Sequence, residues 1–165
     1  TRDADLLQNE VPGDWYYEQI DLGYNYRMTD IQAALGVSQL DRLEEFVERR
    51  NELATRYAGL LANLPLQLPV VPQDRVSSFH LYVVRLLEAA RHADVFAALK
   101  SAGVGVNLHY IPVYLHPFYR AMGFERGYCP EAEAYHASAI TIPLYPSMET
   151  SAQDYVAAQL AKLLT

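Results

Sequence analysis

The side chains best suited to bind a ligand gather in residues 22–36, where polar and cationic groups come directly before a helix start. Asn25 offers an amide and Arg27 offers a guanidinium, both on a stretch without helical periodicity. Thr29 and Gln32 have the spacing of a capping box, which marks the first turn of a helix. A guanidinium beside the positive end of a helix can bind a phosphate or a carboxylate. An anion site is therefore one prediction for this run.

The same run also allows a purely structural interpretation. Tyr24, Tyr26 and Met28 would then wedge the helix into a core, while Asn25 and Arg27 would bond carbonyls of the turn. Helix caps are common, whereas anion sites are few. The residue types alone leave both interpretations open.

Histidine and tyrosine side chains lie at the ends of predicted strands farther along the chain. His109 and Tyr110 end one strand shortly before Pro112, a position where side chains open onto a cleft. His80 lies near the start of another strand, where it could equally be a core histidine that bonds a main-chain carbonyl. The sequence spacing of His109, His116 and Cys129 is not that of a zinc site, so we predict no metal.

Nucleophilic side chains are few. The only lysines, Lys100 and Lys162, lie on amphipathic helical stretches and are predicted to face solvent, whereas a catalytic lysine needs a desolvated pocket. Cys129 is the single cysteine, which excludes an internal disulfide and suits a reducing cytoplasm. We therefore predict no catalytic residue in this chain and expect a cytoplasmic location.

Charge and hydropathy exclude two classes of partner. The formal net charge is −7, and the sequence lacks the cluster of Lys and Arg that nucleic acid binding requires. No apolar run approaches the length needed to span a bilayer, so no membrane partner is expected. With 165 residues, 51% of them hydrophobic, the chain can bury one core and still extend an arm.

Periodicity divides the chain into three parts. Residues 1–28 form an arm with the contact loop, and residues 15–20 within it alternate like a short strand. Residues 29–64 contain one long linking helix, because apolar residues recur at three- and four-residue intervals from 29 to about 61. Three prolines then open a small domain over 65–165.

The small domain is predicted to mix strands and helices. Strands are expected at 79–86, 104–110 and 139–144. Helices are expected at 92–102, where Gly103 ends the first, and at 130–138 and 150–164. This order favours an α+β fold, with a small mixed or antiparallel sheet and helices on one face.

Four blocks occur in the order and at roughly the spacing of a known family, namely residues 22–36, 77–84, 105–114 and 140–146. They resemble the DegT/DnrJ/StrS-type sugar aminotransferases, which are fold type I enzymes that use pyridoxal 5'-phosphate (PLP). The resemblance implies amination of a keto group on a nucleotide-linked sugar, with UDP as the expected nucleotide and glutamate as the donor. It also implies a homodimer with shared active sites and a place in bacterial amino-sugar or surface-glycan synthesis.

The resemblance also implies roles for individual residues. Asn25 aligns with an asparagine that reaches the cofactor phosphate in the other subunit. Tyr114 stands where the family commonly has histidine, which leaves the identity of the sugar or its diphosphate contacts open. The expected substrate contacts are Arg27, Tyr26, His80, His109, Tyr110 and Tyr114.

In the family, the Schiff-base lysine lies in a large domain that precedes the matched region. The chain begins at Thr1 without methionine, so we expect the C-terminal part of a longer enzyme that is inactive alone. Two alternatives stay open. One is a dehydratase of the same fold, in which histidine replaces that lysine, and the other is a non-catalytic binding or dimerisation module.

Overall fold

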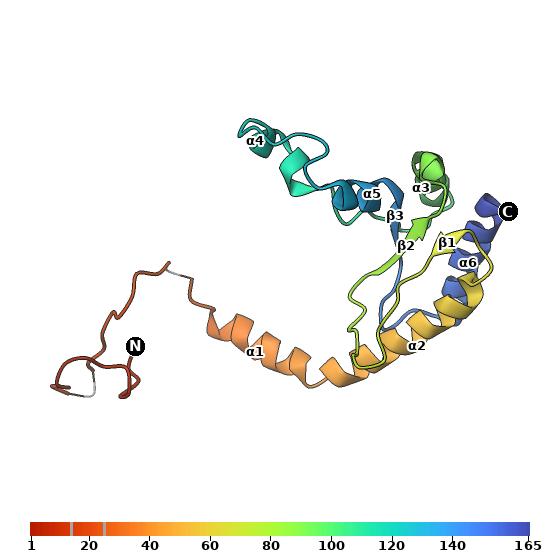
Figure 1. Cartoon of the computed structure of the whole chain (residues 1–165). Coiled ribbons are helices and arrows are strands. Elements are labelled where there is room, and N and C mark those ends of the chain that lie inside the picture. Colours follow the sequence, from red (N-terminus) through yellow and green to blue (C-terminus); the bar gives the residue numbers. More distant parts are fainter. Residues whose placement is uncertain (14, 25) are drawn as a thin grey trace. The chain divides into compact units, whose positions relative to one another are not determined.

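The computed structural model describes residues 1–13, 15–24 and 26–165 (Figure 1). It divides into two compact units, Thr1–Asp41 and Arg42–Thr165. Asn25, the expected cofactor contact, lies outside the described residues. Within the described residues, no helix combines the length and the apolar character that crossing a membrane requires.

The first unit has little regular structure before its one described helix. Residues 15–20 form no strand, contrary to the prediction. No neighbouring strand pairs with them in the described part of this unit, and their alternation alone does not supply a ladder of hydrogen bonds. Their main chain is instead held by separate bonds: the Glu18 N–H donates to the Thr1 carbonyl at 3.0 Å, the amino group of Thr1 donates to the Glu18 carbonyl at 2.5 Å, and the Tyr16 N–H donates to the Gly13 carbonyl at 2.9 Å.

Helix α1 (Asp30–Leu40) begins at the predicted capping box. The Thr29 hydroxyl accepts from the Gln32 N–H at 3.3 Å, and the Gln32 side chain accepts from the Thr29 N–H at 3.0 Å. The spacing of these two residues therefore identified the helix start correctly. None of the helix residues is buried within the unit.

The single helix predicted over residues 29–61 is divided in the structure. Helix α1 ends at Leu40, and α2 (Leu43–Leu61) starts after two intervening residues. Arg42 leaves the helical region with φ −110° and ψ 5°, and its guanidinium lies 5.0 Å from the centre of the Phe46 ring. Both helices share the apolar periodicity, so hydrophobic pattern alone could not reveal the break.

The second unit contains a three-stranded antiparallel sheet in the order β1-β2-β3. Its strands are β1 (Leu66–Gln67), β2 (Tyr82–Leu86) and β3 (Ala139–Ile142). Leu66 pairs with Leu86, and Tyr82 pairs with Ile142. A small mixed or antiparallel sheet was predicted, but β1 was not, because Pro65 and Pro69 flank it on both sides.

The strand predicted over 104–110 is reduced to one isolated bridge between Asn107 and Thr141. Two of its amides bond within the segment instead of forming a ladder. The Val106 N–H donates to the Val104 carbonyl at 2.8 Å, and the Leu108 N–H donates to the Asn107 side chain at 2.8 Å. The local turn thus removes donors that a regular strand would need.

Three helices of the second unit match their predicted positions: α3 (His92–Ser101), α5 (Pro130–Ser138) and α6 (Thr150–Leu164). Gly103 follows α3 with φ +76°, the left-handed conformation that favours glycine after a helix. Short turns occur at Ala89–Arg91 and Val113–Leu115, and α4 (Pro117–Arg120) is a single turn.

One hydrophobic core lies between the sheet and helices α2, α3 and α6 (Figure 1). Alternate residues of β2 face it, namely Tyr82, Val84 and Leu86. Residues on the other side of β2 are half-buried, and one of them, Arg85, lies 5.6 Å from the centre of the Tyr135 ring of α5. The helical contribution comes from Leu53, Tyr57, Leu61, Val95, Leu99, Val156 and Leu160.

Two buried polar side chains tie helices to their neighbours. Gln153 of α6 is fully buried; its amide donates to the Leu53 carbonyl at 2.6 Å and accepts from Arg56 at 3.2 Å. The Tyr57 hydroxyl donates to the Pro143 carbonyl at 3.0 Å, and burial raises the pKa of this phenol far above its usual value. Satisfied buried groups of this kind fix how helices pack.

Candidate functional site

The aromatic and cationic side chains before α1 are exposed within the first unit. Tyr24 and Tyr26 are each 85% exposed, and their rings stack with centres 5.2 Å apart. Met28 is 62% exposed, so within this unit none of the three serves as a core wedge. The structural interpretation of the run is therefore not supported by packing inside this unit.

Arg27 borders two hollows on the surface of the first unit. One has a volume of about 410 Å³ and is also lined by Thr1, Arg2 and Tyr17. The other has a volume of about 510 Å³ and includes Tyr26. Two guanidinium groups at one hollow suit an anionic ligand, because each can offer several donors in a plane.

His80 lies just before β2 and is exposed. It follows Phe79, which has a positive φ of 42° and packs its ring near Tyr82 with centres 6.0 Å apart. The structure thus does not bury His80 between strands, which was its alternative role. The segment that carries it is bonded to helix α2 through Arg50 and Asn51.

His109 sits at the edge of the sheet in a small polar cluster. Its Nδ1 lies 2.8 Å from the hydroxyl of the buried Thr141, and its Nε2 lies 3.3 Å from the amide nitrogen of Asn107. An amide NH₂ only donates, so this arrangement assigns the proton of a neutral ring to Nδ1. The Tyr110 ring stands edge-on to His109 with centres 4.7 Å apart, and it is 71% exposed.

Tyr114 belongs to a different cluster, in which its hydroxyl holds the loop before α5. That hydroxyl donates to Glu133 at 2.5 Å and accepts from the Cys129 N–H at 3.2 Å, while the same Glu133 oxygen accepts from the Gly127 N–H at 2.6 Å. Burial and then the bond to Glu133 raise the pKa of Tyr114. The bond from Tyr114 in turn lowers the pKa of Glu133, and the Gly127 bond adds to this.

The structure brings some of the expected contacts together and leaves others apart. His109 and Tyr110 form one group with Asn107 and Thr141 at the sheet edge. Among the described residues, no hydrogen bond joins this group to His80 or to Tyr114. Arg27 and Tyr26 belong to the first unit, which is described by itself.

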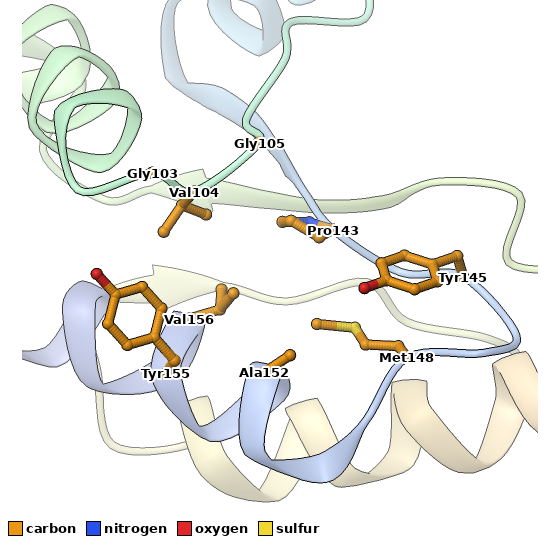
Figure 2. Close-up of a pocket in the computed structure, with 9 residues that line it drawn as sticks. All are labelled: Gly103, Val104, Gly105, Pro143, Tyr145, Met148, Ala152, Tyr155 and Val156. Atoms are coloured by element: carbon orange, nitrogen blue, oxygen red, sulfur yellow. The ribbon is translucent and has the colours of Figure 1, made fainter.

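Sequence reasoning missed an apolar pocket of about 590 Å³ in the second unit (Figure 2). Val104 and Pro143 face Met148, Ala152 and Val156 across it. Tyr145 and Tyr155 stand at its two ends; the Tyr155 hydroxyl donates to the Ala102 carbonyl at 2.8 Å. The one available signal was the pair Gly103 and Gly105, whose missing side chains leave space beside Val104.

Both lysines of the chain lie on exposed faces of helices. Lys100 lies in the last turn of α3 and Lys162 in the last turn of α6. A Schiff-base lysine needs a desolvated site that lowers the cost of its neutral form. Among the residues that the structure describes, no cluster of three or more His, Cys, Asp or Glu side chains is placed to hold a metal ion.

Comparison with known proteins assigns the chain to a family. The profile of the DegT/DnrJ/EryC1/StrS aminotransferase family matches residues 6–161, which is nearly the whole chain. The chain belongs to this family.

Individual relatives agree with this assignment. SpsC of Bacillus subtilis strain 168, a spore coat polysaccharide biosynthesis protein, is 38% identical over 150 residues, or 87% of this chain and 39% of that protein. The UDP-4-amino-4,6-dideoxy-N-acetyl-β-L-altrosamine transaminase of Campylobacter jejuni is 31% identical over 153 residues, or 91% and 40%. The PMP form of Spr1654 from Streptococcus pneumoniae superposes with a TM-score of 0.83 at 30% identity, covering 99% of this chain and 41% of that one.

The chain spans about two fifths of the length of these relatives. The superposition nevertheless covers 99% of the chain. The α+β fold with its small antiparallel sheet is therefore the fold of the corresponding part of a DegT-family enzyme.

Proposed function

We propose that this chain is the C-terminal part of a PLP-dependent aminotransferase that aminates a keto carbon of a nucleotide-linked sugar. The family match over residues 6–161 is the observation that carries this proposal. The name of the Campylobacter relative supports UDP as the nucleotide, and the name of the Bacillus relative supports a product used in a surface polysaccharide. We further propose glutamate as the amino donor and a cytoplasmic homodimer as the working form.

The residues of this chain would bind and orient the substrate. Arg27, which is exposed beside a second guanidinium, suits a diphosphate. His109 is held in one tautomer by Asn107 and Thr141 and suits a sugar hydroxyl, while the exposed Tyr110 ring can cover an apolar sugar face. PLP supplies the electron sink of the amino transfer when it is bound.

The position of Tyr114 narrows its proposed role. Its hydroxyl already serves Glu133 and Cys129, so it can offer one remaining lone pair to a substrate hydroxyl. We propose that it acts mainly by shaping the loop before α5 and only secondarily by direct contact. Replacement by phenylalanine would then raise the KM of the substrate less than replacement of His109 by alanine.

The proposal is tested on the enzyme that contains this chain. Purified enzyme is given PLP, glutamate and a UDP-linked 4-keto sugar, and the sugar product is analysed by mass spectrometry. We expect a product in which an amino group has replaced the keto oxygen. A product that has lost a hydroxyl without gaining nitrogen would show a dehydratase of the same fold, and binding without turnover would support a non-catalytic module.

The chain of 165 residues is expected to hold no covalently attached cofactor, because both of its lysines are exposed. Incubation with PLP, reduction with borohydride and peptide mass spectrometry measure this directly. We expect at most trace labelling of Lys100 and Lys162, at the level of free lysine in a control peptide. Stoichiometric labelling of either residue would contradict the expectation.

A further inference from the structure

One arginine of α2 gathers main-chain carbonyls from two distant segments. The Nη1 atom of Arg50 lies 3.0 Å from the Phe79 carbonyl, 3.3 Å from the His80 carbonyl and 2.9 Å from the Leu144 carbonyl. This nitrogen carries two hydrogens, so the three acceptors share them. Because hydrogen bonds from a charged donor are stronger than neutral ones, the half-buried guanidinium fixes the positions of these carbonyls.

The segment that carries His80 needs such support. Phe79 has φ +42°, a conformation that residues with side chains rarely adopt and that persists where surrounding contacts hold it. The Asn51 amide donates to the Ser77 carbonyl at 2.8 Å, and the Phe79 N–H donates to the Ser77 hydroxyl at 3.1 Å. Two consecutive residues of α2 thus hold both ends of the turn before His80.

The third carbonyl links this turn to the segment after β3. Leu144 is buried, and its neighbours Pro143 and Tyr145 line the apolar pocket (Figure 2). The Arg50 side chain therefore sets the spacing between the His80 turn and one wall of that pocket. Its neighbour Arg49 bonds the Met148 carbonyl at 3.3 Å and so holds the far end of the same segment.

We infer that Arg50 is a positioning residue for His80, acting through the Phe79 and His80 carbonyls rather than by touching the substrate. The inference rests on the proposed function and on the contact with the nucleotide-linked sugar that the family resemblance implies for His80. An exposed side chain on an unsupported turn would lose much of its binding energy to ordering. Arg50 prevents this loss by fixing the backbone from which His80 projects.

A double-mutant cycle in the enzyme that contains this chain tests the inference. The variants are Arg50→Gln, His80→Ala and the combination of both, and the readouts are KM for the UDP-linked keto sugar and kcat. We expect each single change to raise KM about tenfold with kcat within about twofold. The combined variant should also stay near tenfold, because Arg50 acts through His80.

Arg56→Gln is the matched control. Arg56 lies on the same helix, but it pairs with Asp154 at 2.6 Å and with Gln153, away from the His80 turn. The Arg56→Gln variant loses an arginine and a contact between helices α2 and α6. Any change of KM in this variant therefore measures the effect of losing a structural contact alone. We expect KM for the sugar to stay within about twofold in this variant.

The outcomes separate the inference from the proposed function. A roughly hundredfold rise in the combined variant would show that Arg50 and His80 act independently, which overturns the inference. An unchanged KM in Arg50→Gln, with a raised KM in His80→Ala, also overturns it. An unchanged KM in His80→Ala would instead remove His80 from the proposed substrate contacts.

Amide hydrogen exchange on the 165-residue chain gives a test that does not depend on activity. We expect Arg50→Gln to speed exchange of the Phe79 amide at least tenfold while the Val84 amide in the middle of β2 keeps its rate. Ser77→Ala, which removes the acceptor of that amide without touching α2, should show the same local pattern. Equal Phe79 exchange in Arg50→Gln and the unchanged chain would overturn the inference.

Discussion

Glu18 is the polar centre of the first unit. Its carboxylate accepts from the Gln8 N–H at 2.7 Å, from both nitrogens of Asn9 at 2.8 and 2.9 Å, and from the Tyr16 hydroxyl at 2.9 Å. The bond from the Gln8 main chain and then that from the Asn9 side chain lower the pKa of Glu18 from 4.5 to about 2. A residue that the sequence did not distinguish therefore organises this arm.

The lowered pKa predicts an acid-sensitive arm. Since the folded state binds the proton less well than the unfolded state, the contribution of Glu18 is fully present above about pH 4.5 and is lost as pH falls through about 2. Titration of the Glu18 carboxyl carbon by NMR should show this midpoint, with the Gln8 and Asn9 amide signals moving together. Glu18→Gln should remove the shared transition, and a midpoint near 4.5 in the unchanged chain would contradict the network.

Asn25 has the most specific predicted role, although its position lies outside the described residues. If its amide contacts the cofactor phosphate, Asn25→Ala in the enzyme that contains this chain should weaken PLP retention by about 1–2 kcal/mol, the scale of one hydrogen bond to a charged group. Equilibrium dialysis or fluorescence titration measures the change. Asn51→Ala, which alters a structural amide on α2, is the matched control and should leave PLP affinity unchanged.

The elements differ in how well sequence could predict them. Helices α3, α5 and α6 combine apolar periodicity with local stop and start signals such as Gly103 and Pro130, so their bounds were predictable. The break between α1 and α2 depends on the conformation of Arg42, which leaves no mark on the periodicity. Strand β1 depends on pairing with β2 across a long connection, which a local pattern does not contain.

The same contrast applies to the candidate site. His109 and Tyr110 were recognisable from their place before Pro112, and the structure groups them, but Thr141 and Asn107 join them only through pairing at the sheet edge. Arg50 belongs to the charged face of an amphipathic helical stretch, and periodicity alone predicts that such a side chain faces solvent. Its role became visible only when Phe79, His80 and Leu144 came together in space.

Helix α1 depends on its cap more than the other helices do. It buries no residue within its unit, so propensity and the capping box supply its local stability. Thr29→Ala should reduce the stability of this helix by about 1 kcal/mol. Amide exchange of residues 32–40 measures the loss, and Thr55→Ala, which removes a hydroxyl from the middle of α2, controls for general effects.

At the scale of the whole molecule, the two units are stabilised by different kinds of contact. Every residue of the hydrophobic core lies between Leu53 and Leu160, inside the second unit. The first unit relies on Glu18, the capping box and other exposed polar contacts, which contribute little in water. We therefore expect the second unit to fold without the first.

This expectation can be measured on a chain that comprises residues 42–165. It should unfold in one cooperative transition, with a midpoint within a few degrees of that of the core in the full chain, because no core residue has been removed. Circular dichroism and calorimetry give the two midpoints. A chain of residues 42–165 without a cooperative transition would mean that the first unit contributes to the core's stability.

The prolines beside β1 have a consequence for how the molecule behaves at high concentration. Pro65 and Pro69 carry no N–H, and the Pro65 carbonyl already accepts from Leu87 at 3.1 Å. A strand of only two residues between them gives a foreign chain almost no ladder to extend. The β1 edge of the sheet is thus protected against edge-to-edge aggregation by the two prolines that flank it.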